Sequence, residues 1–310
     1  MRYACQYFYP LKEATVDILS SYSQCRLCAR ACGVDRTDGK VGFCHSTDKI
    51  KITRAALHYW EEPIISGTRG SGTVFFSGCS LGCVYCQNVS ISRSSVGLEY
   101  TADTLAAKML ELEEMGAHNI NFVTPTHFAP SIVEATRIAR TLGLGVPIVY
   151  NTGSYDTVET VRALESTVDI YLPDLKYYRS ETAKKLSYAL DYPTVARSAI
   201  AEMVRQRPTP VIEQGIMRSG VIVRVLLLPS HVAEAKLSVK HLYDTYGSNI
   251  YISLMNQYTP MPGMTSPLNR TVTNAEYSEL VSYAEKIGVV NAFVQEGGTQ
   301  SESFIPEFTT

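Results

Sequence analysis

Apolar, strand-like runs alternate with helical patterns along the chain from about Ser71 onward. The run Val221–Leu228 is almost continuously apolar, as expected of a parallel strand that is covered on both faces. The predicted strands are Thr73–Ser77, Asn119–Thr124, Val146–Asn151, Val168–Leu172, Val221–Leu228, Ile250–Met255 and Asn291–Gln295.

Helical periodicity separates these strands. Thr101 can cap a helix over Thr101–Met115 that Gly116 ends, and Ser154 can cap a helix that carries Val158, Val161 and Leu164. The other predicted helical stretches are Pro130–Leu142, Ser180–Arg205 and Asn274–Ile287.

Six or seven strand-then-helix units predict an α/β fold with a parallel sheet and right-handed crossovers, and the count suits a barrel or a partial barrel. The first 65 residues differ, because they hold five of the eight cysteines and little sustained periodicity. We therefore expect a cysteine-rich metal-binding segment over residues 1–65 and a barrel domain over residues 66–310.

Composition narrows the classes of partner. The net charge is −2 and the pI is about 6.3, so no basic excess indicates nucleic acid or an anionic membrane. The amino terminus lacks the apolar core of an export signal, and no apolar run reaches membrane-spanning length. Eight cysteines without an export signal favour metal ligation over disulfides. We expect a cytoplasmic protein without a nucleic-acid or membrane partner.

Three cysteines after the first predicted strand carry the most specific signal. Cys79, Cys83 and Cys86 have the spacing C-x3-C-x2-C. Three thiolates this close can hold three irons of a cubane iron–sulfur cluster, whereas ordinary clusters take four cysteine ligands. The missing ligand leaves one iron open to a substrate or cofactor, which predicts redox chemistry at a bound ligand. A zinc knot or three unrelated core thiols is the alternative.

This motif resembles that of the radical S-adenosylmethionine (SAM) superfamily, in which an aromatic residue, here Tyr85, precedes the third cysteine. The resemblance implies that SAM chelates the open iron of a [4Fe-4S] cluster. The reduced cluster would cleave SAM into methionine and a 5′-deoxyadenosyl radical that abstracts hydrogen.

Polar residues follow nearly every predicted strand. In barrels of this type the active site lies at the carboxyl ends of the strands. The stretches that this rule brings together are Cys79–Cys86, Thr124–His127, Asn151–Gly153, Asp174–Lys176, Pro229–His231 and Asn256–Tyr258.

Four of these strand-end and strand residues leave alternatives open. Asp174 and Lys176 can point to one side of a strand, and either pair with each other or bind the two ends of an amino acid. Arg224 interrupts an apolar strand and needs an anion, which is either an internal carboxylate or the carboxylate of SAM. His127 either donates a hydrogen bond to the cofactor or substrate, or caps a helix.

A second cysteine set lies in the first segment. Cys25, Cys28, Cys32 and Cys44 can close a structural metal site for zinc or for an auxiliary iron–sulfur cluster, and thiolates do not choose between them. His45 could substitute for one ligand, and Cys5 is most simply a free cysteine.

Most of the chain resembles one branch of the superfamily, the proteins similar to pyruvate formate-lyase activating enzyme. The matching stretches are residues 25–32, 58–63, 66–72, 119–127 and 253–258. The resemblance implies a partial (β/α)6 barrel of TIM type, with Cys79, Cys83 and Cys86 as cluster ligands and Tyr85 near the adenine.

The same resemblance implies further cofactor contacts. Asp174 and Lys176 match the Asp-x-Lys that contacts the methionyl part of SAM in the activases, and Asn151 and Thr152 match strand-three contacts more loosely. Thr126 and His127 stand where the activases have a Gly-Gly-Glu-like turn. A low-potential electron donor such as flavodoxin or ferredoxin is also implied.

Two departures bear on the substrate, namely Thr-Pro-Thr-His after the second strand and the added four-cysteine segment. The sequence therefore predicts a radical SAM oxidoreductase that abstracts hydrogen from an unidentified substrate, one candidate being a glycine of a partner glycyl radical enzyme. The alternatives are radical modification of a small molecule or of another protein side chain, and a metal-binding scaffold without turnover.

Overall fold

The computed structural model describes residues 18–295 and residue 308 of the chain. Cys5 lies outside the described residues. None of the helices within the described ranges combines the length and apolar character needed to cross a membrane.

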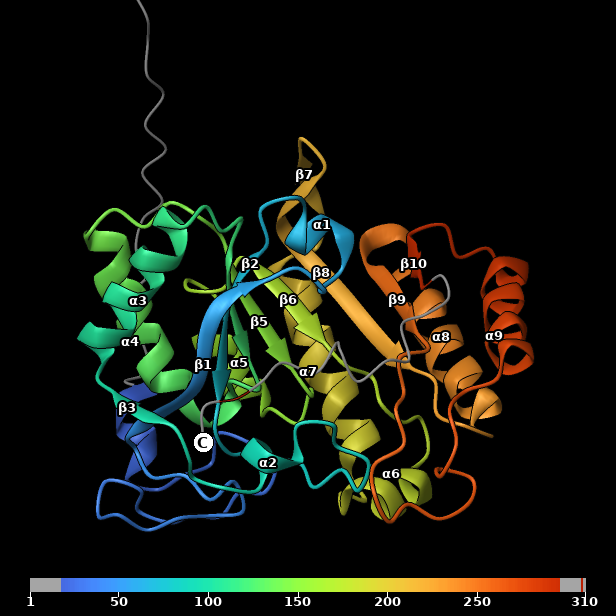
Figure 1. Ribbon diagram of the computed structural model, residues 1–310, viewed down its shortest axis with the longest axis horizontal. Coiled ribbons are helices and arrows are strands. Elements are labelled where there is room, and N and C mark those ends of the chain that lie inside the picture. Colours follow the sequence, from blue (N-terminus) through green and yellow to red (C-terminus); the bar gives the residue numbers. More distant parts are fainter. Residues whose placement is uncertain (1–17, 296–307, 309–310) are drawn as a thin grey trace, which may run out of the picture.

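One curved sheet organises the molecule, in the strand order β10-β9-β8-β6-β5-β4-β2-β1-β3 (Figure 1). Seven of its strands run parallel, namely β2 (Ser71–Phe76), β4 (Ile120–Val123), β5 (Ile148–Thr152), β6 (Ile170–Pro173), β8 (Ile216–Leu226), β9 (Tyr251–Met255) and β10 (Ala292–Val294). They correspond to the seven predicted strands. The predicted α/β partial barrel of TIM type is confirmed.

Antiparallel strands extend this sheet. β1 (Ile50–His58) pairs with β2, β3 (Leu98–Tyr100) pairs with β1, and β7 (Val211–Glu213) pairs with β8. β1 lies within the first 65 residues, so the sheet continues across the boundary expected there.

Helices connect the parallel strands and cover the convex side of the sheet (Figure 1). They are α1 (Pro63–Ser66), α2 (Val89–Ser92), α3 (Ala102–Glu114), α4 (Ala129–Thr141), α5 (Val158–Ala163), α6 (Ser180–Ser187), α7 (Tyr192–Gln206), α8 (Val232–Tyr246) and α9 (Asn274–Ile287). Short 3-10 helices cover Ile18–Tyr22, Thr126–Phe128 and Gly247–Asn249.

Local capping explains where two of these helices begin. Thr101 caps α3 as predicted, because its hydroxyl accepts from the amide of Thr104. The predicted cap at Ser154 is wrong. Thr157 caps α5 instead, whereas Ser154 has a left-handed backbone with φ 62° and belongs to the preceding turn.

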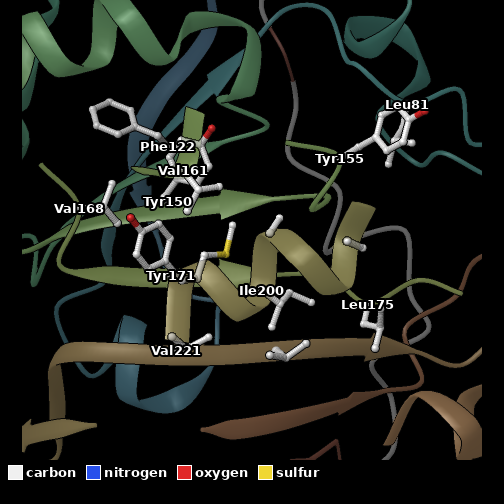
Figure 2. Close-up of a cluster of buried hydrophobic side chains, with 14 of the residues drawn as sticks. Leu81, Phe122, Tyr150, Tyr155, Val161, Val168, Tyr171, Leu175, Ile200 and Val221 are labelled. Atoms are coloured by element: carbon white, nitrogen blue, oxygen red, sulfur yellow. The ribbon is translucent and has the colours of Figure 1, made fainter. Parts of the chain in front are cut away.

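The core lies between the sheet and its helices. Figure 2 shows Ile200 of α7 packed between side chains of neighbouring strands, among them Tyr171 and Val221. These side chains are at most 1% exposed. The parallel strands are thereby covered on both faces, and their polar ends remain free to line a site.

The amino-terminal segment packs at the carboxyl ends of the strands, where its loops lie at the lower edge of Figure 1 beside α2. The amide of Ala29 donates to the carbonyl of Tyr155, and Cys28 forms a β-bridge with Asp156. The segment is therefore anchored to the loop that follows β5.

Candidate active site

A cavity of about 260 Å³ opens at the carboxyl ends of the parallel strands. It is lined by residues that follow or end β2, β4, β5, β6 and β9, as the barrel rule predicts. The predicted residues in its lining are Cys79, Cys83, Tyr85, Cys86, Thr126, Asn151, Thr152, Asp174, Lys176 and Arg224.

The cysteine loop leaves β2 through Gly78, whose φ of 87° favours glycine. A Cβ at this position would lie 2.4 Å from the carbonyl oxygen of Cys44. The close approach therefore requires glycine, and it presses the start of the loop against the amino-terminal segment.

Each sulfur of this loop has a hydrogen-bonding partner. The amide of Leu81 donates to Cys79 Sγ over 3.3 Å, and Ser187 Oγ donates to Cys83 Sγ over 2.9 Å. Cys86 Sγ lies 3.5 Å from the hydroxyl of Ser92. Donors of this kind stabilise thiolates, so the three sulfurs fit the ligands of an iron–sulfur cluster.

No three His, Cys, Asp or Glu side chains in the described ranges are placed to hold a single metal ion. A cubane cluster binds each cysteine to a different iron, so it does not require three sulfurs around one point. The common cavity and the donors to each sulfur agree with a cluster of this kind.

A chain of buried hydroxyls leads from Tyr85 to one of the cysteines. Tyr85 Oη lies 2.7 Å from Tyr177 Oη, which lies 2.6 Å from Ser187 Oγ. Because Ser187 donates to Cys83, the aromatic residue of the motif is linked to a cluster-loop sulfur through two intermediates. Sequence reasoning missed Tyr177 and Ser187.

A buried ion network lies on the strands beside the cysteine loop. Arg224 Nε donates to Asp174 Oδ1 over 2.8 Å, and Lys176 Nζ donates to Asp174 Oδ2 over 2.6 Å. Arg224 also lies 3.5 Å from a carboxylate oxygen of Glu61 and donates to Asn151 Oδ1 over 2.6 Å. Two acids and two bases thus balance within the cavity wall.

Glu61 was not among the predicted site residues. It lies between β1 and α1, lines the cavity, and accepts from the amides of Asn121 (3.0 Å) and Asn151 (3.2 Å). The segment after β1 therefore contributes an acidic group to the barrel interior.

The network sets the pKa of its carboxyls. Burial raises the pKa of Asp174, but the charges of Arg224 and Lys176 outweigh it and leave this pKa below its usual value. The neighbouring Glu62 is different. Burial raises its pKa to about 7 against the opposing charge of Arg224, and one carboxyl oxygen has no hydrogen-bond partner in the described residues.

Hydroxyls cluster at the end of β5. Thr152 Oγ1 donates to Asp156 over 2.7 Å and lies 3.4 Å from the hydroxyl of Thr126. Thr126 and Thr152 both line the cavity. These two residues are thus brought together as the sequence reasoning expects of strand ends.

His127 lies outside the lining of this cavity. Burial and the nearby charge of Arg36 lower its pKa to about 3, so the ring is neutral. Its Nε2 therefore carries the proton and donates to the carbonyl of Ser77 over 2.7 Å. His127 instead lines a smaller pocket together with Cys25, Cys28, Cys32 and Cys44. The cofactor contact expected of His127 stays a prediction.

Comparisons with known proteins give the following matches. Residues 73–203 match the family model described as the radical SAM superfamily. The curated relative, uncharacterized protein MJ0674 of Methanocaldococcus jannaschii, is 27% identical over 288 residues, which cover 89% of this chain and 79% of the relative.

Solved structures are similar at lower identity. SuiB of Streptococcus suis bound to S-adenosylmethionine has a TM-score of 0.46 at 10% identity, over 71% of this chain and 48% of its own. HydG, a maturase of the [FeFe]-hydrogenase, has a TM-score of 0.48 at 17% identity, over 69% and 48%. A domain of pyruvate-formate lyase-activating enzyme from Bacteroides vulgatus has a TM-score of 0.43 at 13% identity, over 58% and 100%. The chain spans about half the length of the SuiB and HydG chains.

Proposed function

Residues 73–203 belong to the radical SAM superfamily, and from this premise we propose that the chain is an enzyme that cleaves S-adenosylmethionine reductively at a [4Fe-4S] cluster. Cys79, Cys83 and Cys86 hold the cluster. The observation that supports this assignment is that all three sulfurs line one cavity and each has a hydrogen-bonding partner.

When bound and reduced, the cluster supplies one electron to the sulfonium of SAM, and the products are methionine and a 5′-deoxyadenosyl radical that abstracts hydrogen. A low-potential donor such as flavodoxin or ferredoxin provides the electron. Methionine is zwitterionic, and the cavity wall offers it both signs of charge, with Asp174 and Glu61 as acids and Lys176 as a base.

The remaining residues orient the cofactor. Thr126, Asn151 and Thr152 present hydrogen-bonding groups on the wall next to the ion network. Tyr85 is 5% exposed and lines the same cavity, so its ring offers a stacking surface for the adenine. Arg224 already has two internal acids, so its part is to hold Asp174 and Glu61 in place.

For the hydrogen donor we propose a segment of a partner protein. Trp60 lines the cavity yet is 64% exposed, and the adjacent Tyr59 is 51% exposed. Exposed aromatic rings at the rim of a polar cavity are typical anchors for a polypeptide. A glycine α-carbon of a glycyl radical enzyme is one such donor, and a side chain of another protein or a small molecule is the alternative.

Electron paramagnetic resonance of the anaerobically reconstituted protein tests the cofactor assignment. Adding SAM to the reduced protein should change the cluster spectrum, because SAM binds the open iron. The variant with Cys79, Cys83 and Cys86 replaced by alanine should show no SAM-dependent signal. A SAM-dependent change that persists in this variant would overturn the ligand assignment.

A further inference from the structure

A fully buried arginine lies beside the four cysteines of the amino-terminal segment. Arg36 is 0% exposed and is the largest fully buried side chain among the described residues. Its guanidinium donates to the carbonyl oxygens of Ser46 (3.1 Å), His127 (2.5 Å) and Thr47 (2.5 Å). It also lies over the rings of Tyr22 and Phe128.

None of these contacts neutralises the charge. No carboxylate of the described residues lies within ion-pair distance of Arg36, unlike Arg224, which has two. Carbonyl oxygens and aromatic faces solvate a guanidinium but leave its net charge in place. A buried charge without an opposite charge is costly, so the site calls for an anion.

The nearest candidate anion is a cysteine sulfur. Arg36 Nη1 donates to Cys25 Sγ over 3.8 Å. Arg36 lines the small pocket that also contains Cys25, Cys28, Cys32 and Cys44, while His45 does not line it. Four neutral thiols would not compensate the guanidinium. Four thiolates bound to a metal centre would, because such a centre keeps a net negative charge.

We propose that Cys25, Cys28, Cys32 and Cys44 hold a second, closed metal centre, and that Arg36 is its built-in counter-cation. The shared chemistry is a tetrathiolate bound to zinc or to an iron–sulfur cluster. The spacing of the cysteines and the buried, otherwise uncompensated arginine are independent observations that converge on this site. The proposal stands apart from the chemistry at Cys79, Cys83 and Cys86.

The centre is built against the catalytic loop. Arg30, between two of the cysteines, donates to the carbonyl oxygens of Ser80 (3.0 Å), Ser187 (3.2 Å) and Tyr188 (2.7 Å). Cys44 presses its carbonyl against Gly78 at the start of the same loop. A metal in this pocket therefore fixes the backbone from which Cys79 projects.

Metal analysis in a background without the first cluster tests the proposal. The variant with Cys79, Cys83 and Cys86 replaced by alanine should retain about one zinc or about four irons per chain after treatment with a chelator. Adding Cys32→Ser should remove this metal, because Cys32 is exposed and its loss spares the core. Adding Cys5→Ser instead is the matched control, and it should leave the metal in place.

Either metal at that stoichiometry supports the centre and identifies it. A metal-free triple variant, in which the four cysteines all react with a thiol reagent, overturns it. This outcome is independent of the first cluster, which the variant lacks, so it can be told apart from a failure of the proposed function.

Arg36 is tested by competition with a chelator. Arg36→Met should lower metal affinity about 10–100-fold, as loss of a group that supports metal ligands does, and Arg36→Lys should lower it less because the charge remains. Equal metal affinity in the wild type and both variants would refute the counter-cation role. If Arg36→Met does not fold, Arg36→Lys decides: wild-type affinity or failure to fold contradicts the role, and partial loss supports it.

Discussion

The guanidinium of Arg224 and the carboxylate of Asp174 are joined across β8 and β6, with Nε 2.8 Å from Oδ1. The same guanidinium reaches Glu61, which arrives from the far end of the chain's barrel domain. The sequence left the anion for Arg224 open between an internal carboxylate and the cofactor. The structure supplies two internal carboxylates.

Replacing Arg224 by methionine should therefore destabilise the protein without any cofactor present. Asp174 and Glu61 would be left as buried acids with one fewer base, and breaking a buried pair costs about 3–5 kcal/mol. Because the three side chains keep some exposure, of 9–16%, we expect a value near the lower end, about 3 kcal/mol. Thermal unfolding of the cofactor-free protein measures this.

Lys240→Met is the matched control, because Lys240 and Asp244 form an exposed ion pair on α8 that should contribute little. An Arg224→Met protein with a wild-type melting temperature and weakened SAM affinity would show that Arg224 serves the cofactor instead.

Glu62 should make stability fall as the pH rises. Its pKa is raised from its ordinary value of 4.5 to about 7 in the folded state, so folding favours the protonated form. That preference is fully present below pH 4.5 and is lost as the pH rises through 7. At about 1.4 kcal/mol per pH unit, the ionised group costs up to about 3 kcal/mol above pH 7.

Glu62→Gln should thus raise the melting temperature at pH 8 and change it little at pH 5. Calorimetry at the two pH values measures the difference, with the exposed Glu285→Gln as the control that should follow the wild type. A Glu62→Gln protein with the same pH profile as the wild type would contradict the buried, ionisable state of Glu62.

Ser187 should tune the cluster that Cys83 helps to hold. Its hydroxyl donates to Cys83 Sγ over 2.9 Å, and such a bond favours the more negative, reduced state. Ser187→Ala should make the reduction potential more negative by about 20–60 mV, which corresponds to a net hydrogen bond of about 0.5–1.5 kcal/mol at about 59 mV per tenfold change. A redox titration monitored by electron paramagnetic resonance measures the shift.

Ser92→Ala provides the comparison, because the hydroxyl of Ser92 lies farther from its sulfur, at 3.5 Å from Cys86. It should shift the potential less than Ser187→Ala does. Equal potentials in the wild type and Ser187→Ala would show that this hydrogen bond does not influence the cluster.

Strand runs and the barrel rule predict much of this architecture. Continuous apolar runs locate the parallel strands because those strands are buried on both faces, and their shared carboxyl ends bring Cys79, Asn151 and Asp174 to one cavity. The helix Ser180–Arg205 was only partly resolved by periodicity. It is divided into α6 and α7 where Tyr188 adopts a left-handed backbone with φ 53°, which local apolar spacing does not reveal.

Other features depend on contacts that no local pattern encodes. Glu61 joins the site because β1 pairs with β2 and carries the following loop into the barrel, about 160 residues from Arg224 in sequence. Arg36 looks like any charged residue of a polar loop, and only its complete burial shows that it needs an anion. The helix α8 was overlooked, although Ala235, Val239 and Leu242 have the spacing of a buried face.

The most direct test of the central claim is product analysis of the anaerobically reconstituted, chemically reduced protein incubated with SAM. The account predicts that 5′-deoxyadenosine and methionine form in equal amounts, and that neither forms in the variant with alanine at Cys79, Cys83 and Cys86. A wild-type protein that carries a full cluster, binds SAM and yet releases no 5′-deoxyadenosine, with or without candidate substrates, would contradict radical SAM turnover by this chain.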